Sequence, residues 1–162
     1  MRERLLLSDQ KEIDWYYIDS PESVIVVPFV SPDRLLLIRQ FRRNLGKDTL
    51  ELPAGTIHQG ESADSAALRE LREETGYAAK TAAFELLGRF YVLPSETNRY
   101  VSIYRAYPIE HVGPPTRDQE IEKYFDMSLV EMGFDDAIAA LGDAIQGIET
   151  SAALLLAARR RP

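Results

Sequence analysis

The chain has 162 residues and no cysteine, and its 19 basic and 26 acidic side chains give a net charge of −7. This composition predicts one soluble globular domain over residues 1–162 and excludes thiol catalysis, disulfide bonds and cysteine-bound zinc. The only basic cluster is Arg159–Arg161, so no nucleic-acid partner is expected. No membrane span or secretory signal is visible, and a cytoplasmic location is therefore expected.

Strands are predicted in the first part of the chain. Residues 4–7 and 12–18 form two short strands on either side of a polar turn. Val24–Val30 is an almost continuous β-branched run, which is typical of a strand that is covered on both faces. Arg34–Phe41 follows a Ser-Pro-Asp turn signal and is the expected hairpin partner of that strand.

The middle of the chain predicts one helix between strands. Residues 49–52 form a short strand that ends at Pro53. A helix begins at Glu61-Ser62 and runs to about Thr75, where Gly76 stops it. Residues 84–92 and 98–107 are the next two expected strands.

The last part of the chain mixes a loop, a strand and helices. A Gly/Pro-rich loop over residues 111–119 precedes an expected strand at residues 121–127. Residues 134–144 and 151–161 are expected to be helical. The whole pattern predicts an α+β fold with a mainly antiparallel or mixed sheet and few helices.

The segment Gly55–Tyr77 contains residues at fixed offsets that a helix alone does not require. Five residues separate Gly55 from Glu61, and seven separate Glu61 from Arg69. The cluster Arg69–Glu74 then ends at Gly76. At 100° per residue, the three glutamates at positions 70, 73 and 74 fall within about 100° of one another.

Ala63, Ala66 and Ala67 lie on the same helical arc as these glutamates, so we expect a shallow and strongly negative groove. Like charges at this spacing destabilise a bare helix, whereas a hard divalent cation such as Mg²⁺ compensates them. Arg69 is four residues before Glu73 and can pair with it. An isolated cluster of this kind would indicate a solvated acidic face, but the fixed glycine and glutamate offsets favour a metal site.

These residues resemble the Nudix box, G-x5-E-x7-R-E-U-x-E-E-x-G-U, in which U is a bulky apolar residue. The one departure is Tyr77, where an aliphatic residue is usual. The resemblance implies the Nudix fold, an α/β/α sandwich with a mixed sheet, here with additional N-terminal antiparallel strands. It also implies hydrolysis of a nucleoside diphosphate that is linked to another group.

The resemblance assigns roles to the box residues. It implies Mg²⁺ as cofactor, with Mn²⁺ as a substitute, held by Glu70, Glu74 and the backbone carbonyl of Ala54. Glu73 is implied as a ligand or as a close neighbour of the ligands, so Glu73 and Glu74 belong to the catalytic set. Arg69 is also placed in that set, and with Glu61 it is expected to hold the loop and the helix together.

The flanking segments narrow the branch of the family. Ile38–Arg42 (IRQFR), Leu50–Gly55 (LELPAG) and Gly147–Ala157 (GIETSAALLLA) are similar to ADP-ribose and nucleoside-diphosphate-sugar pyrophosphatases. This similarity implies that Arg42 contacts the diphosphate and that Glu51 contacts the terminal sugar. A surface arginine and an edge-strand carboxylate are the plainer interpretations of these two residues.

The same branch implies a base, a nucleobase contact and a dimer. Glu120 is the expected base that activates water, with Glu122 as the alternative. Strands in residues 1–20 are expected to form a homodimer, in which Trp15 stacks on the base of the substrate. Ordinary packing is the alternative role of Trp15.

The expected reaction converts ADP-ribose, or a related sugar nucleotide, to a nucleoside monophosphate and a sugar phosphate. Pro94 is followed by Ser95 and Glu96 rather than by the glycine of a Ser-Pro-Gly loop, so GDP-mannose or another sugar nucleotide stays open. The sequence also leaves open a dinucleotide or housecleaning hydrolase and a non-catalytic nucleotide-binding module. The isolated His58 and His111 are expected to be surface residues.

Overall fold

A seven-stranded mixed sheet organises the molecule, in a computed structural model that describes residues 1–116 and 127–161. The main strand order is β11-β4-β3-β9-β8, with β5 paired to β4 and β6 paired to β3. The strands are β3 (Ser23–Ser31), β4 (Arg34–Arg42), β5 (Lys47–Glu51), β6 (Ala54–Thr56), β8 (Phe84–Tyr91), β9 (Tyr100–Ala106) and β11 (Met127–Gly133). β3 pairs antiparallel with β4 and parallel with β9, which makes the sheet mixed.

The central strand β3 is buried on both faces. Ile25, Val27 and Phe29 contribute to one hydrophobic cluster, whereas Val24 and Val26 contribute to the other. Successive side chains of a strand point to opposite faces of the sheet, so each cluster takes every second residue. The continuous apolar run in the sequence is explained by these two cores.

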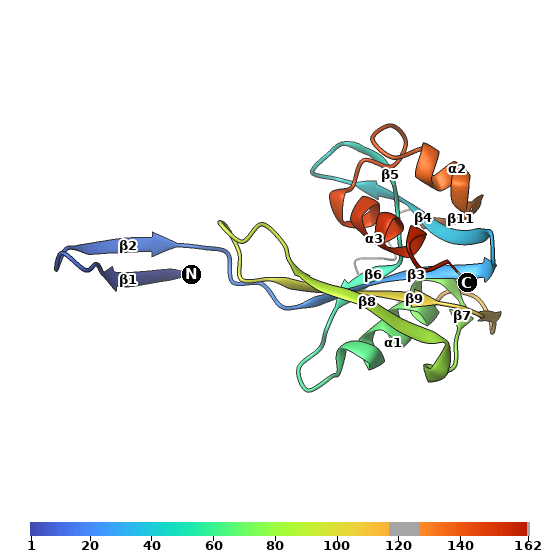
Figure 1. Ribbon diagram of the computed structural model, residues 1–162, viewed down its shortest axis with the longest axis horizontal. Coiled ribbons are helices and arrows are strands. Elements are labelled where there is room, and N and C mark those ends of the chain that lie inside the picture. Colours follow the sequence, from blue (N-terminus) through green and yellow to red (C-terminus); the bar gives the residue numbers. More distant parts are fainter. Residues whose placement is uncertain (117–126, 162) are drawn as a thin grey trace.

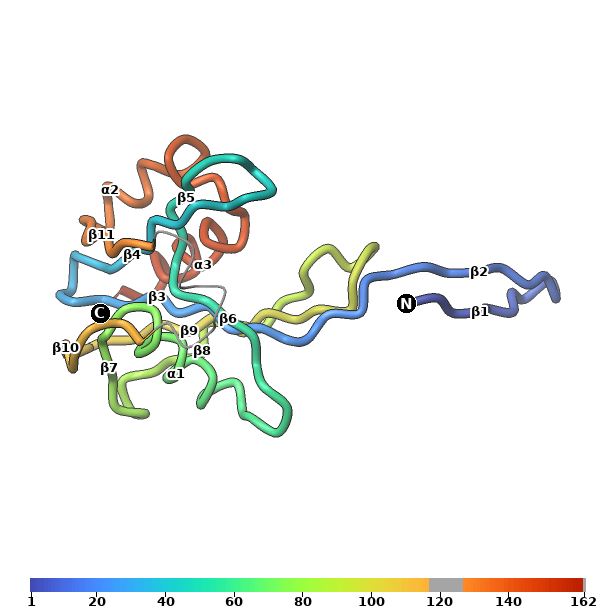
Figure 2. The backbone as a smooth tube through the Cα atoms, turned by 180° about the vertical axis from the view of Figure 1, so that it is seen from behind, coloured from blue at the N-terminus to red at the C-terminus, as the bar shows by residue number. Residues whose placement is uncertain are grey.

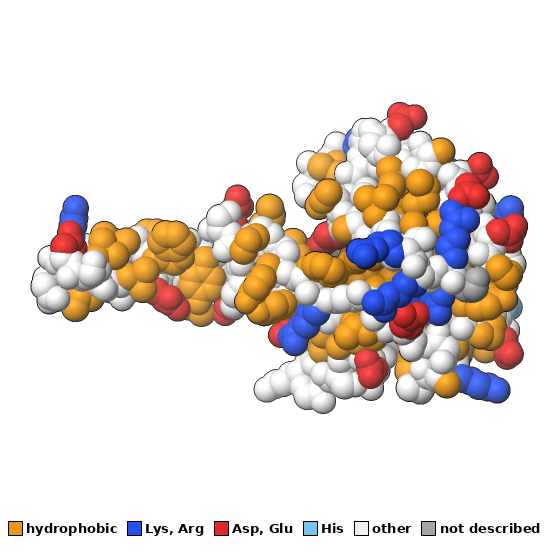
Figure 3. Space-filling model, in the orientation of Figure 1, with side chains coloured by type: hydrophobic (Ala, Val, Ile, Leu, Met, Phe, Trp, Pro, Cys, Tyr) orange, Lys and Arg blue, Asp and Glu red, His pale blue; other side chains and the backbone are white. Residues whose placement is uncertain are grey.

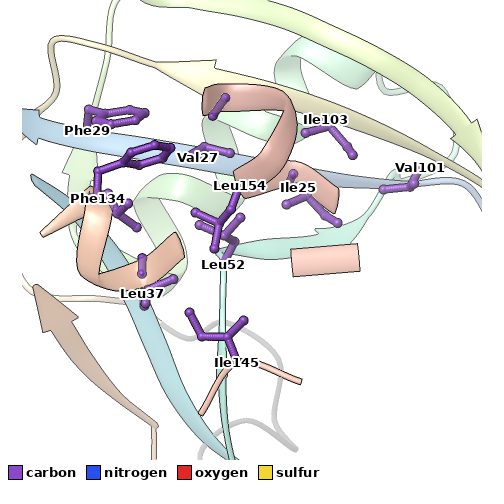
Figure 4. Packing of buried hydrophobic residues seen from close by; sticks show 14 residues of the cluster. Ile25, Val27, Phe29, Leu37, Leu52, Val101, Ile103, Phe134, Ile145 and Leu154 are labelled. Carbon is purple, nitrogen blue, oxygen red and sulfur yellow. The ribbon is translucent and has the colours of Figure 1, made fainter. Parts of the chain in front are cut away.

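Helices cover both faces of the sheet (Figure 1). α1 (Ala63–Thr75) lies on one face, and α2 (Phe134–Ala139) and α3 (Ile148–Ala158) lie on the other. Figure 4 shows the second interface, in which Phe134 and Leu154 meet the inward side chains of β3. The expected α+β fold, an α/β/α sandwich around a mixed sheet, is confirmed.

The termini of α1 follow from local sequence chemistry. The Ser62 hydroxyl caps the helix by accepting from the Ser65 amide at 3.2 Å. Gly76 ends the helix with a φ of 74°, and its amide donates to the Arg72 carbonyl at 2.8 Å. A Cβ at position 76 would lie 2.0 Å from the Gly113 oxygen, so both the backbone conformation and the neighbouring chain require glycine.

The position of the alanines on α1 shows that one expectation from the sequence, an open groove beside them, is wrong. Ala66 and Ala67 are fully buried against the sheet, together with Leu71. They therefore do not line an open groove. Small side chains on this face let the helix approach β3 closely, and Glu70 on the same face becomes buried as well.

The N-terminal strands form a separate hairpin. β1 (Arg2–Leu6) pairs antiparallel with β2 (Glu12–Tyr16), as the sequence predicts. Figures 1 and 2 show this hairpin projecting away from the sheet. Its large apolar side chains are exposed, and in Figure 3 they form a nearly continuous orange surface along the projection.

Several boundaries differ from the sequence-based expectation. α2 ends at Ala139 instead of residue 144, and α3 spans Ile148–Ala158 instead of residues 151–161. Residues 128–133 belong to β11, which the sequence did not predict, while most of the expected strand at 121–127 lies outside the described residues. The strands β7 (Tyr77–Ala78) and β10 (Glu110–His111) and the 3₁₀ turn η1 (Thr81–Ala83) were not expected either.

The three α-helices of the described chain are too short or too polar to cross a lipid bilayer. His58 and His111 are both exposed, as expected, and the ring of His111 packs edge-on against Tyr77 at a centroid distance of 5.1 Å.

Candidate active site

Arg69 of α1 binds three carboxylates, one in the segment before the helix and two on the helix itself. Its guanidinium donates to both Glu61 oxygens at 3.0 Å. It also donates to Glu70 at 2.7 Å, to Glu73 at 3.1 Å and to the Thr56 carbonyl at 2.9 Å. The planar guanidinium fork matches a carboxylate with two parallel hydrogen bonds, so the loop is fastened to the helix in one orientation.

Arg69 and Glu61 each stabilise the charged form of the other. Hydrogen bonds from Arg69, with a further one from the His58 amide at 3.0 Å, lower the pKa of Glu61 to about 2. The hydrogen bond to Glu61 is also the largest cause of the raised pKa of Arg69. Both groups are therefore charged throughout the physiological pH range, as the expected role in holding loop and helix together requires.

Glu70 explains why position 55 is glycine. Its side chain is buried, with 2% of the residue exposed. A Cβ built on Gly55 would lie 2.0 Å from the Glu70 carboxyl carbon and from one carboxylate oxygen. The glycine thus creates the space in which the Glu70 carboxylate lies against the backbone of β6.

Glu74, which is four residues after Glu70 on α1, contacts the same part of the β6 backbone. Its carboxylate accepts a hydrogen bond of 2.9 Å from the backbone amide of Ala54. Ala54 precedes Gly55 in β6, so Glu70 and Glu74 both meet the Ala54-Gly55 backbone. The structure therefore brings together three of the residues for which the sequence implies a metal-binding role, and Glu73 joins them through Arg69.

The composition of this cluster fits a divalent cation. Glu61, Glu70 and Glu73 surround one guanidinium, Glu74 lies against the Ala54 amide, and Glu70 is buried. A buried carboxylate without sufficient positive charge costs several kcal/mol, and hard cations prefer carboxylate and carbonyl oxygens. In residues 1–116 and 127–161, however, no group of three His, Cys, Asp or Glu side chains is already arranged so that it could hold a metal ion.

A second arginine lies beside the cluster. Arg42, at the end of β4, donates to the two Glu51 oxygens at 2.8 and 2.5 Å, and the Thr49 hydroxyl donates to Glu51 at 2.6 Å. The Glu51 hydrogen bond raises the pKa of Arg42, and the charges of Glu74 and Glu149 act in the same direction. Burial pushes the pKa of Glu51 upward, but the hydrogen bonds from Arg42 and Thr49 lower it below its ordinary value.

Arg42 and Glu51 line a cavity of about 440 Å³, which we call the arginine cleft. The ionic side chains of Arg99 and Glu149, the polar residues Asn44 and Thr150, Gly147 and four apolar side chains complete its wall. The charges of both Glu74 and Glu149 raise the pKa of Arg42, so Arg42 is near one box carboxylate as well as in the wall of the cleft. A ligand that bound both the box and this cavity would therefore pass close to Arg42.

Trp15 lies on the projecting hairpin, apart from α1 (Figure 1). It is 46% exposed and lines a separate hollow of about 370 Å³ with Tyr17, Tyr91 and Pro94. We call this the aromatic hollow. Glu120 and its alternative, Glu122, lie outside the described residues.

The sequence reasoning missed Arg99 and Glu149. Their side chains form an ion pair in the wall of the arginine cleft. Glu149 falls in the segment Gly147–Ala157 that resembled sugar-nucleotide pyrophosphatases, which is the one signal that could have drawn attention to it. No local spacing links it to Arg99, fifty positions earlier.

Known proteins match both the sequence and the fold. The chain is 29% identical over 121 residues to the ADP-ribose pyrophosphatase of Bacillus subtilis (strain 168), which covers 75% of this chain and 63% of that protein. It is 45% identical over 67 residues to the ADP-sugar pyrophosphatase of Mus musculus, which covers 39% of this chain and 31% of that protein. The chain thus spans less than two thirds of the length of these curated relatives.

A crystal structure of an ADP compounds hydrolase has the same fold, with a TM-score of 0.79 at 24% identity over 98% of this chain and 83% of that chain. The family model described as NUDIX domain matches residues 19–145, which include the whole of α1 and the turn before it. Because this match covers most of the chain, the protein belongs to the NUDIX domain family.

Proposed function

We propose that the protein hydrolyses the diphosphate bond of ADP-ribose or a related nucleoside diphosphate sugar, giving a nucleoside monophosphate and a sugar phosphate. One observation carries the proposal. Arg42 lines a cavity of about 440 Å³, which is large enough for a sugar, and it is near enough to Glu74 of the box for that charge to raise its pKa. The names of the Bacillus subtilis and Mus musculus relatives support the same substrate class.

The proposal assigns the box residues to metal binding. Glu70, Glu74 and the Ala54 carbonyl hold Mg²⁺, or Mn²⁺ in its place, and Glu73 is a further ligand or supports them. The cation neutralises the diphosphate and lowers the pKa of the attacking water when it is bound. Arg69 orients Glu70 and Glu73, to which it donates hydrogen bonds of 2.7 and 3.1 Å.

Other residues position the substrate. Arg42 binds the diphosphate, for which a guanidinium is the matching donor, and Glu51 accepts from hydroxyls of the terminal sugar. Glu120 is the proposed base that takes a proton from the attacking water. Hydrolysis by phosphoryl transfer depends mainly on positioning and charge stabilisation, which suits a site built from ion pairs.

A homodimer through the N-terminal hairpin is also part of the proposal. The hairpin exposes Leu5, Leu6, Trp15 and Tyr16, and a two-stranded hairpin is only marginally stable in water by itself. A second copy would cover this apolar surface. Trp15, which lines the aromatic hollow, would then stack on the nucleobase.

Residues 1–162 are proposed to act as one domain in the cytoplasm, on small nucleotide derivatives and without a nucleic-acid or membrane partner. The net charge of −7 supports a small substrate recruited through a cation, because a nucleic-acid backbone would be repelled.

A substrate panel tests the proposed function. Release of phosphorylated products from ADP-ribose, ADP-glucose, GDP-mannose, a diadenosine polyphosphate and a nucleoside triphosphate is measured with Mg²⁺ and with Mn²⁺. The proposal predicts that kcat/KM is highest for one of the sugar nucleotides. A preference for the triphosphate or the dinucleotide contradicts the substrate class, and nucleotide binding without release of products contradicts the enzymatic function.

A further inference from the structure

The arginine cleft contains a second ion pair that the proposed catalytic roles do not use. Arg99 directly precedes β9, and Glu149 lies in the first turn of α3. Their side chains form a salt bridge, are 30% and 37% exposed, and line the cleft. The pair faces the same cavity as Arg42 and Glu51.

Hydrogen bonds from backbone amides hold the segments that carry both members of this pair. The Arg99 carbonyl accepts from the Val92 amide at 3.0 Å, which ties the end of the turn to the strand before it. The side-chain hydroxyl of Thr150, next to Glu149, accepts from the Leu52 amide at 3.3 Å. The start of α3 is thereby held beside the segment that leads from Glu51 to Ala54, and Glu149 has a defined position relative to the box.

The charges of the cleft favour a neutral, hydroxyl-rich ligand. Arg42 and Arg99 are each paired with a carboxylate, and the four formal charges cancel. A guanidinium only donates hydrogen bonds and an ionised carboxylate only accepts them, whereas a hydroxyl does both. A hydroxyl can therefore accept from Arg99 and donate to Glu149 without leaving either charge unpaired.

The rest of the cavity wall points to the same class of ligand. Leu45, Val92, Leu93 and Ile148 provide apolar surface that can cover the C–H groups of a sugar ring. Among the described residues, no aromatic side chain lines the arginine cleft, while Trp15, Tyr17 and Tyr91 line the aromatic hollow. Nucleobases bind preferentially to aromatic faces, so the arginine cleft is suited to the sugar and not to a second nucleoside.

We propose that Arg99 and Glu149 together bind hydroxyls of the terminal sugar and make the site selective for sugar nucleotides. The inference rests on the proposed function, since it concerns the part of the substrate beyond the diphosphate. Arg99 and Glu149 are specificity-determining residues in this scheme, separate from the box that performs the hydrolysis.

Equilibrium binding to two non-hydrolysable ligands tests this inference. α,β-Methylene-ADP-ribose and α,β-methylene-ADP share adenosine and the diphosphate mimic, but only the first has the terminal ribose. Loss of hydrogen bonds to a charged group should make Glu149→Gln bind the ribose-bearing ligand about 10- to 100-fold more weakly. Its affinity for α,β-methylene-ADP should stay within about threefold of the wild-type value.

Two further variants separate recognition from folding. Arg99→Lys keeps a cation next to Glu149 but loses the guanidinium fork, and it should show the same selective loss for the ribose-bearing ligand. Glu131→Gln breaks an exposed ion pair with Arg34 on β4 and β11 and is the matched control. It should bind both ligands as the wild type does.

Equal weakening of both ligands in the Glu149 and Arg99 variants, or no weakening of either, would overturn the inference. Because these measurements use binding alone, their result is independent of turnover. If the wild type does not hydrolyse ADP-ribose while the selective loss is observed, the proposed function fails and the sugar-binding role of the pair stands.

Discussion

At the scale of single residues, the contact between Gly55 and Glu70 links the backbone of β6 to the chemistry of the box. The three atoms nearest to a Cβ built at position 55 all belong to the Glu70 carboxylate, at 2.0 to 2.4 Å. Gly55 is not among the glycines with positive φ, so alanine is excluded by this contact and not by backbone strain.

We therefore predict that Gly55→Ala lowers the free energy of unfolding by about 1–3 kcal/mol through overpacking. In a Glu70→Ala background, the same substitution should cost much less, because the clashing carboxylate is absent. Urea denaturation of the wild type, both single variants and the double variant measures this coupling. If the losses of unfolding free energy in the two single variants add up to the loss in the double variant, the Gly55–Glu70 contact is not the reason why position 55 is glycine.

The low pKa of Glu61 predicts a pH dependence of stability. Arg69 holds this pKa at about 2, below the ordinary value of 4.5. The folded state thus binds the proton less tightly than the unfolded state does, so the charged form stabilises the fold above about pH 5. This contribution is lost as the pH falls from 4.5 towards 2.

The melting temperatures of the wild type and Glu61→Gln between pH 7 and pH 2 test this prediction. The difference should be largest near neutral pH and should shrink steadily below pH 4.5. Glu131→Gln, which loses only an exposed ion pair that solvent screens, is the control. If the melting temperatures of the wild type and Glu61→Gln differ by the same amount at pH 7 and at pH 2, the negative charge of Glu61 is not what stabilises the fold.

At the scale of elements, the parts that local chemistry determines could be predicted from the sequence. α1 was expected to begin at Glu61-Ser62 and to end at Thr75, and it spans Ala63–Thr75 with Ser62 as its cap. Capping and left-handed glycine depend on residues within one turn of the helix end. The apolar runs of β3 and β4 are similarly self-contained, because a continuous apolar run fits a strand whose alternate side chains enter the cores on both faces of the sheet.

Features that depend on distant packing could not be predicted in this way. A helical wheel places Ala66 and Ala67 beside the glutamates, but it does not show that the sheet covers that face. β11 has a mixed burial pattern that gives only a weak strand signal. Arg99 and Glu149 become neighbours only when the start of α3 meets the end of the turn before β9.

The N-terminal hairpin gives a prediction at this scale. Few contacts join the hairpin to the rest of the molecule. One of them, just after β2, is a hydrogen bond of 2.7 Å from the Ile18 amide to the Glu96 backbone carbonyl. Removal of residues 1–17 should therefore leave the sheet folded but convert a dimer to a monomer of about half its mass. Light scattering after size exclusion measures the mass, for which one chain weighs 18.3 kDa.

Leu86→Glu on β8 is the control for this experiment, because Leu86 is exposed and lies outside the hairpin. It should leave the mass of the assembly unchanged. A monomeric full-length protein, or a dimer that persists without residues 1–17, would contradict the proposed role of the hairpin.

At the scale of the whole molecule, the distribution of charge matches the proposed chemistry. The chain carries a net charge of −7, yet its proposed substrate is a diphosphate. Arg42 and Arg99 are both engaged by glutamates, and Arg69 is shared by three carboxylates. The protein alone thus offers little uncompensated positive charge in this region, and a divalent cation is the group that can make the site attractive to a diphosphate.

Hydrolysis of ADP-ribose by the wild type, Glu74→Gln and the Glu131→Gln control, with and without Mg²⁺, tests this scheme most directly. The wild type and the control should release AMP and ribose 5-phosphate in equal amounts, and only with the cation. Glu74→Gln should keep its melting temperature but turn over at least about 1,000-fold more slowly, which corresponds to about 4 kcal/mol of lost transition-state stabilisation. Unchanged hydrolysis by Glu74→Gln would contradict the assignment of the box carboxylates to the reaction.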